Sequence, residues 1–139
     1  MKVSLLIGLT FGVFATTPGV AHHAAAALYL LDQELIIEGI VTEYQFINPH
    51  ARVYLDVVNA DGEVEQWLAE GGSPNVLRRH GWDGQELKQG DRITITGNPP
   101  RDGSKLVHWV TITLPDGSEL FGEDVDFGAV DRLRRQQRD

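Results

Sequence analysis

Apolar and polar residues alternate through most of the segments between residues 35 and 114, and this alternation constrains the fold more than any other feature. A period of two places the apolar side chains on one face of a strand, whereas a helix would spread them around its axis. The clearest case is residues 52–58, in which every second residue is apolar. The pattern predicts strands at residues 36–46, 52–58, 63–70, 92–97 and 106–114, a short sixth one at 119–121, and buried side chains at Val53, Leu55, Val57, Ile93, Ile95, Val110 and Ile112.

Glycine and proline mark how these strands are connected. Gly39 interrupts the first predicted strand and indicates a bulge or a tight bend. Asn48-Pro49 predicts a turn after that strand, and the Asn-Ala-Asp-Gly run at residues 59–62 predicts a hairpin loop between the second and third strands.

One short helix is expected at residues 75–80, between the third and fourth strands. Ser73 is a suitable N-cap, Pro74 suits the first helical position, and Gly81 can end the helix in a left-handed conformation. Residues 83–86, Asp-Gly-Gln-Glu, resemble a capping box and predict one further helical turn.

Three strands, a short helix and two strands form the element order of an OB-fold, a five-stranded, partly open β-barrel. A two-layer α+β sandwich with a meandering sheet is the alternative. The length of 139 residues fits a single domain. We therefore divide the chain into a signal peptide at 1–21, an N-terminal arm at 22–34, a β-barrel domain at 35–121 and a charged tail at 122–139, the last expected to be frayed or partly helical.

The first 21 residues have the organisation of an export signal. Lys2 precedes an apolar run of about 13 residues, and Gly19-Val20-Ala21 places small residues at the −3 and −1 positions of a cleavage site. Cleavage after Ala21 makes His22 the first residue of a periplasmic or secreted protein. The run is shorter than the ~20 residues that span a bilayer, so we expect no permanent membrane anchor after cleavage.

Two alternatives to this processing remain open. A second possible cut follows Ala15 and would leave the histidines inside the chain. The same segment could also be a buried N-terminal helix, although nothing downstream offers a matching helical face.

Charge and motif content exclude several functions. The net charge is −8, and removing residues 1–21 takes away only Lys2 and leaves −9, which argues against binding to nucleic acid. The chain has no cysteine, so thiolate metal sites and cysteine nucleophiles are excluded. Ser73 lies in Gly-Gly-Ser-Pro-Asn, which is not a nucleophile elbow, and no other catalytic motif is present. We therefore do not expect an enzyme, and the sequence identifies no protein partner.

Several short motifs in order resemble those of an uncharacterised family of small exported bacterial proteins, classed as a domain of unknown function. They are His22-His23, Asn48-Pro49-His50, Gly71-Gly72-Ser73-Pro74-Asn75, Gly81-Trp82, Leu87-Lys88-Gln89-Gly90-Asp91 and Leu114-Pro115-Asp116-Gly117. The resemblance covers residues 15–121 and implies secretion and a common fold, but no established activity. The chain departs from the family pattern at Phe46-Ile47, where an aromatic residue and threonine are usual, and at Ala24, where serine is usual.

The histidines give the most specific functional hypothesis. An N-terminal His22 would offer its free amine and its imidazole as a chelating pair, and His23 adds a nearby donor. His50 follows the turn between the first two strands, where its side chain could face the arm. Imidazole nitrogen suits copper and zinc, and copper leads the divalent affinity order, so we expect Cu(II) bound by His22 with His50, or with His23 in its place. The alternative is that the His22-His23 pair is incidental to the cleavage site.

A different hypothesis uses the tryptophans. Trp67, Trp82 and Trp109 could form an aromatic face on an OB-like barrel that binds a small ligand or a protein partner without metal. The alternative for these three residues is that they fill a small core.

Overall fold

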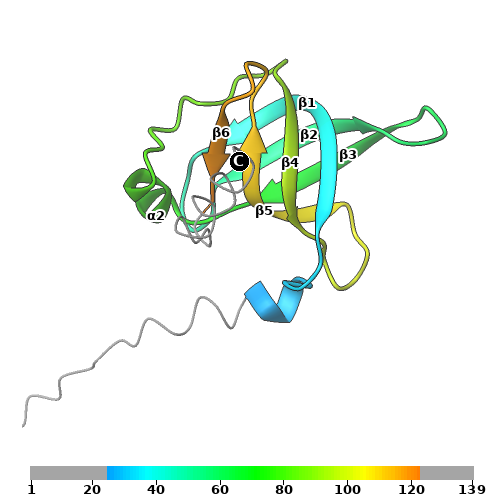
Figure 1. Cartoon of the computed structure of the whole chain (residues 1–139), viewed down its shortest axis with the longest axis horizontal. Coiled ribbons are helices and arrows are strands. Elements are labelled where there is room, and N and C mark those ends of the chain that lie inside the picture. Colours follow the sequence, from blue (N-terminus) through cyan, green and yellow to red (C-terminus); the bar gives the residue numbers. More distant parts are fainter. Residues whose placement is uncertain (1–24, 123–139) are drawn as a thin grey trace, which may run out of the picture.

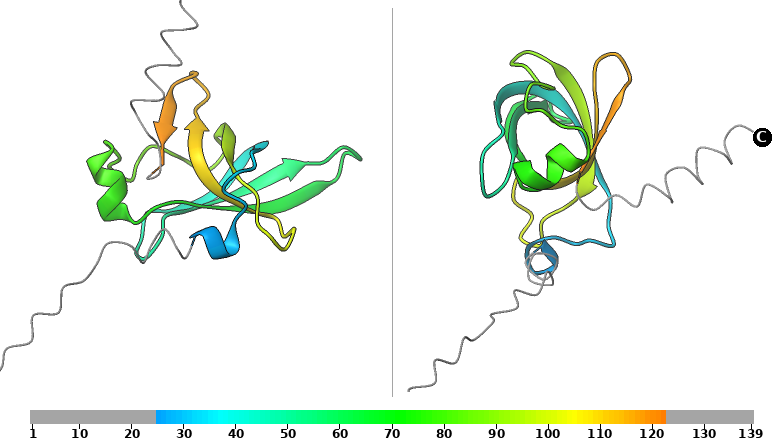
Figure 2. Two further views of the ribbon diagram at one scale, coloured as in Figure 1. Left: turned by 60° about the horizontal axis from the view of Figure 1, so that its bottom comes forward. Right: turned by 90° about the vertical axis from the view of Figure 1, so that its left-hand side faces the viewer.

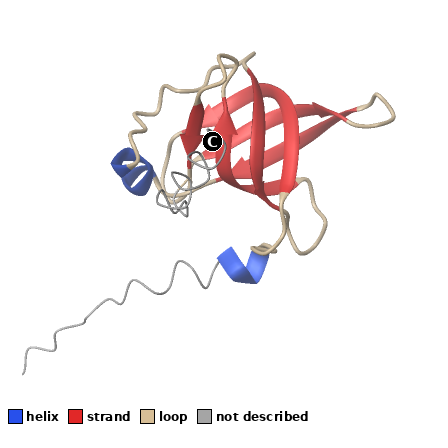
Figure 3. Ribbon diagram, in the orientation of Figure 1, coloured by secondary structure: helices blue, strands red, loops and turns tan. Residues whose placement is uncertain are grey.

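The computed structural model describes residues 25–122, which form one small β-barrel (Figure 1). Its elements are six strands and one helix: β1 (Leu35–Gln45), β2 (Arg52–Val58), β3 (Val64–Glu70), α2 (Pro74–Arg79), β4 (Arg92–Asn98), β5 (Leu106–Thr113) and β6 (Glu119–Phe121). A single helical turn at 25–28 precedes them (Figure 3). No helix among residues 25–122 is long and apolar enough to cross a membrane. Residues 1–24 and 123–139, which include the expected cleavage site and almost all of the predicted tail, lie outside the described residues.

The strands follow the order β3-β2-β1-β4-β5-β6, and a further pairing between β3 and β5 closes the first five into a barrel. This closing pair is parallel and joins residues 68–70 to residues 106–108. The OB-like fold predicted from the sequence is therefore confirmed, with a closed barrel in place of a partly open one, and β6 extends the sheet beyond β5. The two-layer sandwich does not occur.

Helix α2 lies across one end of the barrel (Figure 2). It begins as predicted: Ser73 is the N-cap, its hydroxyl accepts a hydrogen bond from the Val76 N–H at 3.4 Å, and Pro74 follows. Leu77 points from the helix into the core and is fully buried. Gly81 has a φ of +93° directly after the helix, the left-handed conformation that glycine adopts at low cost.

The predicted helical turn at residues 83–86 is wrong. Glu86 turns its carboxylate back onto the N–H groups of Asp83 and Gly84, as a capping box would, but no helix follows. Gly84 has a φ of +93°, outside the helical region, and the ring of Phe46 fills the space where a Cβ would lie. The capping contacts therefore stabilise a loop.

Five of the seven predicted core residues are buried, and two are only half-buried. Val57 comes directly after Asp56, the last β2 residue paired with β1, and pairs only with Glu65 of β3. From here the β2–β3 hairpin extends past the barrel (Figure 1). Val110 is half-buried for another reason. Gly97 pairs with Trp109 and Thr96 with Thr111, so Val110 is an extra residue in a β-bulge. The bulge reverses which residues of β5 point inward, and alternation alone does not reveal it.

Gly39 is a site of close strand contact, while the bulge in β1 lies further along, between Val41 and Glu43. A Cβ at Gly39 would lie 2.8 Å from the carbonyl oxygen of Asp56, so only glycine allows β1 and β2 to approach this closely.

We expect Leu55→Ala to lower the free energy of unfolding by about 2–5 kcal/mol, because Leu55 is 1% exposed and its removal leaves a cavity. Chemical denaturation followed by circular dichroism measures this change. Val58→Ala, on the same strand but 65% exposed, is the control and should cost less than about 0.5 kcal/mol. Equal losses in the two variants would contradict the assigned core.

Candidate functional site

His50 lies in the connection between β1 and β2, at the end of the barrel that α2 covers. This connection contains a cis Asn48–Pro49 peptide bond and is held to the end of β3 by two backbone hydrogen bonds, Ala51 N–H to Gly72 O and Gly71 N–H to Ala51 O, both 3.0 Å. The backbone that carries His50 is therefore fixed against the segment that leads from β3 into the helix.

One nitrogen of the His50 ring is 3.1 Å from a backbone carbonyl, Nδ1 from Gly71 O. A carbonyl oxygen only accepts, so Nδ1 carries the proton and donates it. In the neutral ring, Nε2 then keeps its lone pair, and His50 is exposed. Histidines that bind metals usually have this arrangement, with the other ring nitrogen donating to a carbonyl or a carboxylate.

The N-terminal arm reaches the same end of β3 through Tyr29. This residue is 2% exposed, its hydroxyl donates to Glu70 Oε2 at 3.3 Å, and its ring centroid lies 5.2 Å from that of His108. Glu70 also forms an ion pair with Arg52 at 3.0 Å, across the β2–β3 pair. The arm and the His50 connection are thus attached at neighbouring positions, Glu70 and Gly71.

Further hydrogen bonds hold the arm against the β4–β5 loop. Leu30 N–H donates to Pro99 O, Arg101 N–H donates to Leu28 O, and the Arg101 side chain donates to Ala26 O at 3.0 Å. The contacts that place the arm on the barrel join it to distant residues, so the sequence of the arm gives no sign of them. Tyr29, Glu70 and Arg52, which place the arm, were missed for that reason.

The remaining candidate metal ligands, His22 and His23, lie outside the described residues. Within residues 25–122, no three histidine, aspartate or glutamate side chains lie close enough to hold a metal ion together.

The other two histidines, His80 and His108, make contacts that stabilise the fold. His80 is the C-cap of α2, and its Nδ1 donates to Gly122 O at 2.8 Å. His108 is 6% exposed beneath the Tyr29 ring. Strand parity alone would place His108 on the same face as Val110 and Ile112, but the bulge breaks that parity and Tyr29 of the arm covers the ring.

Two of the three tryptophans lie in the core. Trp82 and Trp109 are 3% and 1% exposed and stack with ring centroids 5.8 Å apart. The Trp82 Nε1 donates to Phe121 O at 2.8 Å. Trp109 packs against the backbone at Gly71, where an added Cβ would lie 2.1 Å from the ring. These two rings fill the barrel end, so they are not on the surface that a ligand would meet.

Trp67 is partly exposed on β3, but neighbouring side chains already contact its ring and its indole nitrogen. Its Nε1 donates to Glu65 at 3.3 Å, and the Lys105 ammonium lies 5.3 Å from the ring centroid and 2.8 Å from the Glu65 carboxylate. The Lys105 contacts lower the pKa of Glu65. Of the aromatic face suggested by the sequence, this residue alone reaches the surface.

Together, the topology and the site define a small OB-like barrel with an anchored N-terminal arm and an oriented histidine at the capped end. The chain belongs to a family of unknown function, DUF6152, whose model matches residues 12–108. The resemblance to an uncharacterised family is thereby confirmed. No curated protein matches the chain.

Tyr29 and Tyr44 should ionise well above the ordinary tyrosine pKa of about 10. Burial raises both pKa values, and the acceptors Glu70 and Glu86 raise them further. Because the folded state favours the neutral phenols, their contribution to stability is present below pH 10 and is lost as the pH rises above it. Absorbance titration at alkaline pH measures this ionisation.

The variants Tyr29→Phe and Tyr44→Phe show how much of the late ionisation each tyrosine contributes. Each should remove part of the late-titrating signal and reduce the alkaline loss of stability. If the complete signal of the unmodified chain titrates near pH 10 while the fold persists, the assigned contacts are wrong.

Proposed function

We propose that the protein is an exported module that binds Cu(II) through its mature N-terminus. The amine and imidazole of His22 would form one chelate ring, and His50 Nε2 would be the third ligand, with His23 as the alternative. The proposal assumes cleavage after Ala21, which the Lys2, apolar-run and Gly19-Val20-Ala21 pattern supports.

The observation that carries the proposal is the state of His50. Its Nδ1–H is held by Gly71 O, and its exposed Nε2 is left as an acceptor in the neutral ring. A ligand with a fixed tautomer and orientation binds a metal without first losing rotational freedom.

The arm starts from a fixed point beside the proposed site. Tyr29 is fixed on Glu70, next to the residue that holds His50. His22 precedes the helical turn at residues 25–28 by three residues, which span at most roughly 10 Å when extended. A short tether from a fixed point raises the effective concentration of the N-terminal ligands near His50.

The chemistry of the donors favours copper. A free amine and imidazole nitrogens suit Cu(II) and Zn(II), and Cu(II) binds more tightly in the divalent affinity series. Magnesium and calcium prefer oxygen ligands, which this set does not contain.

The mature protein isolated from its native host should begin at His22. N-terminal sequencing or intact mass determines the first residue. A chain that begins at Thr16, or that keeps residues 1–21, would contradict the proposed amine ligand.

Protein that begins at His22 and carries no affinity tag should bind one Cu(II) in a calorimetric titration. The matched variant His50→Asn keeps an N–H donor for Gly71 O but lacks the Nε2 atom that would bind the metal. It should weaken binding at least about tenfold, as should His50→Ala. Acetylation of the N-terminal amine removes its lone pair and should weaken binding as strongly.

The control for the copper titration is His80→Asn, because His80 also donates its Nδ1 to a backbone carbonyl but lies outside the proposed ligand set. It should bind Cu(II) as the unchanged protein does. Affinity should fall as the pH drops through about 6.5, because a protonated imidazole has no lone pair for the metal. Equal binding by all variants, or binding by none, would rule the site out.

A further inference from the structure

Strand β1 is longer than its partner on one side. It pairs with β4 from Leu35 to Ile40, but its pairing with β2 begins only at Ile40. Beyond that residue, the β2–β3 hairpin diverges from β1 (Figure 1). Within residues 25–122, the edge of residues 35–39 that faces away from β4 therefore has no partner strand.

The backbone direction along this edge follows from one pair of hydrogen bonds. Val41 N–H donates to Asp91 O and Gly90 N–H donates to Val41 O, so the peptide groups of Val41 face β4. Since these groups alternate along an antiparallel strand, those of Ile36 and Glu38 face the open side. This edge can accept another strand.

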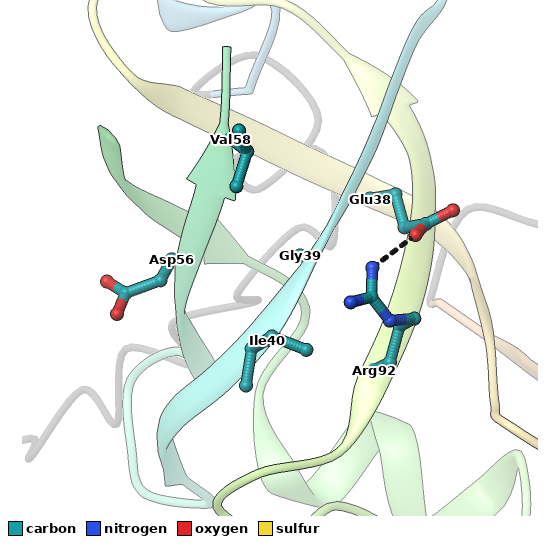
Figure 4. Close-up of a pocket in the computed structure, with 6 residues that line it drawn as sticks. All are labelled: Glu38, Gly39, Ile40, Asp56, Val58 and Arg92. Carbon is teal, nitrogen blue, oxygen red and sulfur yellow. Dashed lines mark hydrogen bonds and ion pairs between the residues drawn. The ribbon is translucent and has the colours of Figure 1, made fainter. Parts of the chain in front are cut away.

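A hollow of about 180 Å³ lies where the strands diverge (Figure 4). It is lined by Glu38, Gly39, Ile40, Asp56, Val58 and Arg92. Pockets for drug-sized ligands usually measure about 300–1,000 Å³, so this one has room for a single long side chain. Among the six lining residues, the one ion pair joins Glu38 to Arg92 at 2.7 Å.

Three exposed apolar side chains lie on the strands around this hollow. Ile36 on β1 is 60% exposed, and Val58 and Val64, paired across β2 and β3, are 65% and 62% exposed. Strand parity places all three on the outer face. An open strand edge beside exposed apolar residues is a site at which proteins add a strand from a partner.

Charge decides between two possible occupants. The chain has a net charge of −8, and the hairpin beside the hollow carries Asp56, Asp61 and Glu63. A second copy of the chain would bring the same negative charge to the edge, whereas a basic segment would be attracted.

We propose that residues 35–39 bind an extended, basic segment of a partner protein as an added antiparallel strand. The backbone of the segment pairs with Ile36 and Glu38. One lysine or arginine of the segment places its aliphatic stem in the hollow between Ile40 and Val58, with its cation near Asp56. This surface is distinct from the His50 connection and does not depend on metal.

A capped peptide of alternating lysine and valine tests the proposal with the mature protein. It should bind in calorimetry, and its binding should weaken at higher salt. In ¹⁵N-labelled protein, the amide signals of Ile36 and Glu38 should shift. The variant Ile36→Lys places a charge on the open edge and should weaken binding at least tenfold. Ile47→Lys is the matched control, 52% exposed in the β1–β2 connection, and should bind as the unchanged protein does.

Two further peptides separate strand pairing from simple charge attraction. A peptide with every backbone amide N-methylated has no N–H to donate and cannot pair as a strand, and one with glutamate in place of lysine lacks the cation; neither should bind. Equal binding by the N-methylated peptide, shifts away from β1, or no binding at all would overturn the proposal. So would a dimer of the protein in solution that Ile36→Lys dissociates, since a second copy would then occupy the edge.

Discussion

The packing of Trp109 against the backbone at Gly71 is the contact on which the rest of the molecule depends. A Cβ at Gly71 would lie 2.1 Å from the ring, so glycine is required there. The contact brings the end of β3 against β5, where the parallel pairing closes the barrel. Trp82 stacks on the same ring and joins the segment after α2 to the core. A large aromatic ring thus supplies the core that so short a barrel would otherwise lack.

The same contact determines the position of His50. Gly71 packs on Trp109, and its carbonyl oxygen accepts a hydrogen bond from His50 Nδ1. The neighbouring Glu70 binds Tyr29 and so holds the arm. Closure of the barrel, orientation of the histidine and anchoring of the arm therefore all depend on two consecutive residues, and a disturbance of the core at Trp109 would reach the surface at His50.

The two proposed surfaces differ in how the fold creates them. The His50 connection is at the end of the barrel where strands are joined and capped by α2 (Figure 2). The edge of β1 is open because β1 pairs with β4 from Leu35 onward but with β2 only from Ile40 onward. The oriented side chain of the His50 connection favours a small ligand. The free peptide groups of the β1 edge favour an extended polypeptide segment.

The sequence by itself determined the strands and the helix, because alternation, an N-cap and glycine at helix ends are local signals. Their order favoured an OB-like barrel over a sandwich, but the pairing of β3 with β5 that closes the barrel is a tertiary contact. It also singled out His50 by its place after a turn. Only the tertiary structure decided the burial of Val110 and His108, because a bulge opposite Gly97 and a covering arm arise between distant segments. It likewise decided that Trp82 and Trp109 fill the core and that Gly71 orients His50. Such contacts join segments that are distant in the sequence, from Gly97 and Trp109 at the bulge to Tyr29 and His108, and no local pattern encodes them.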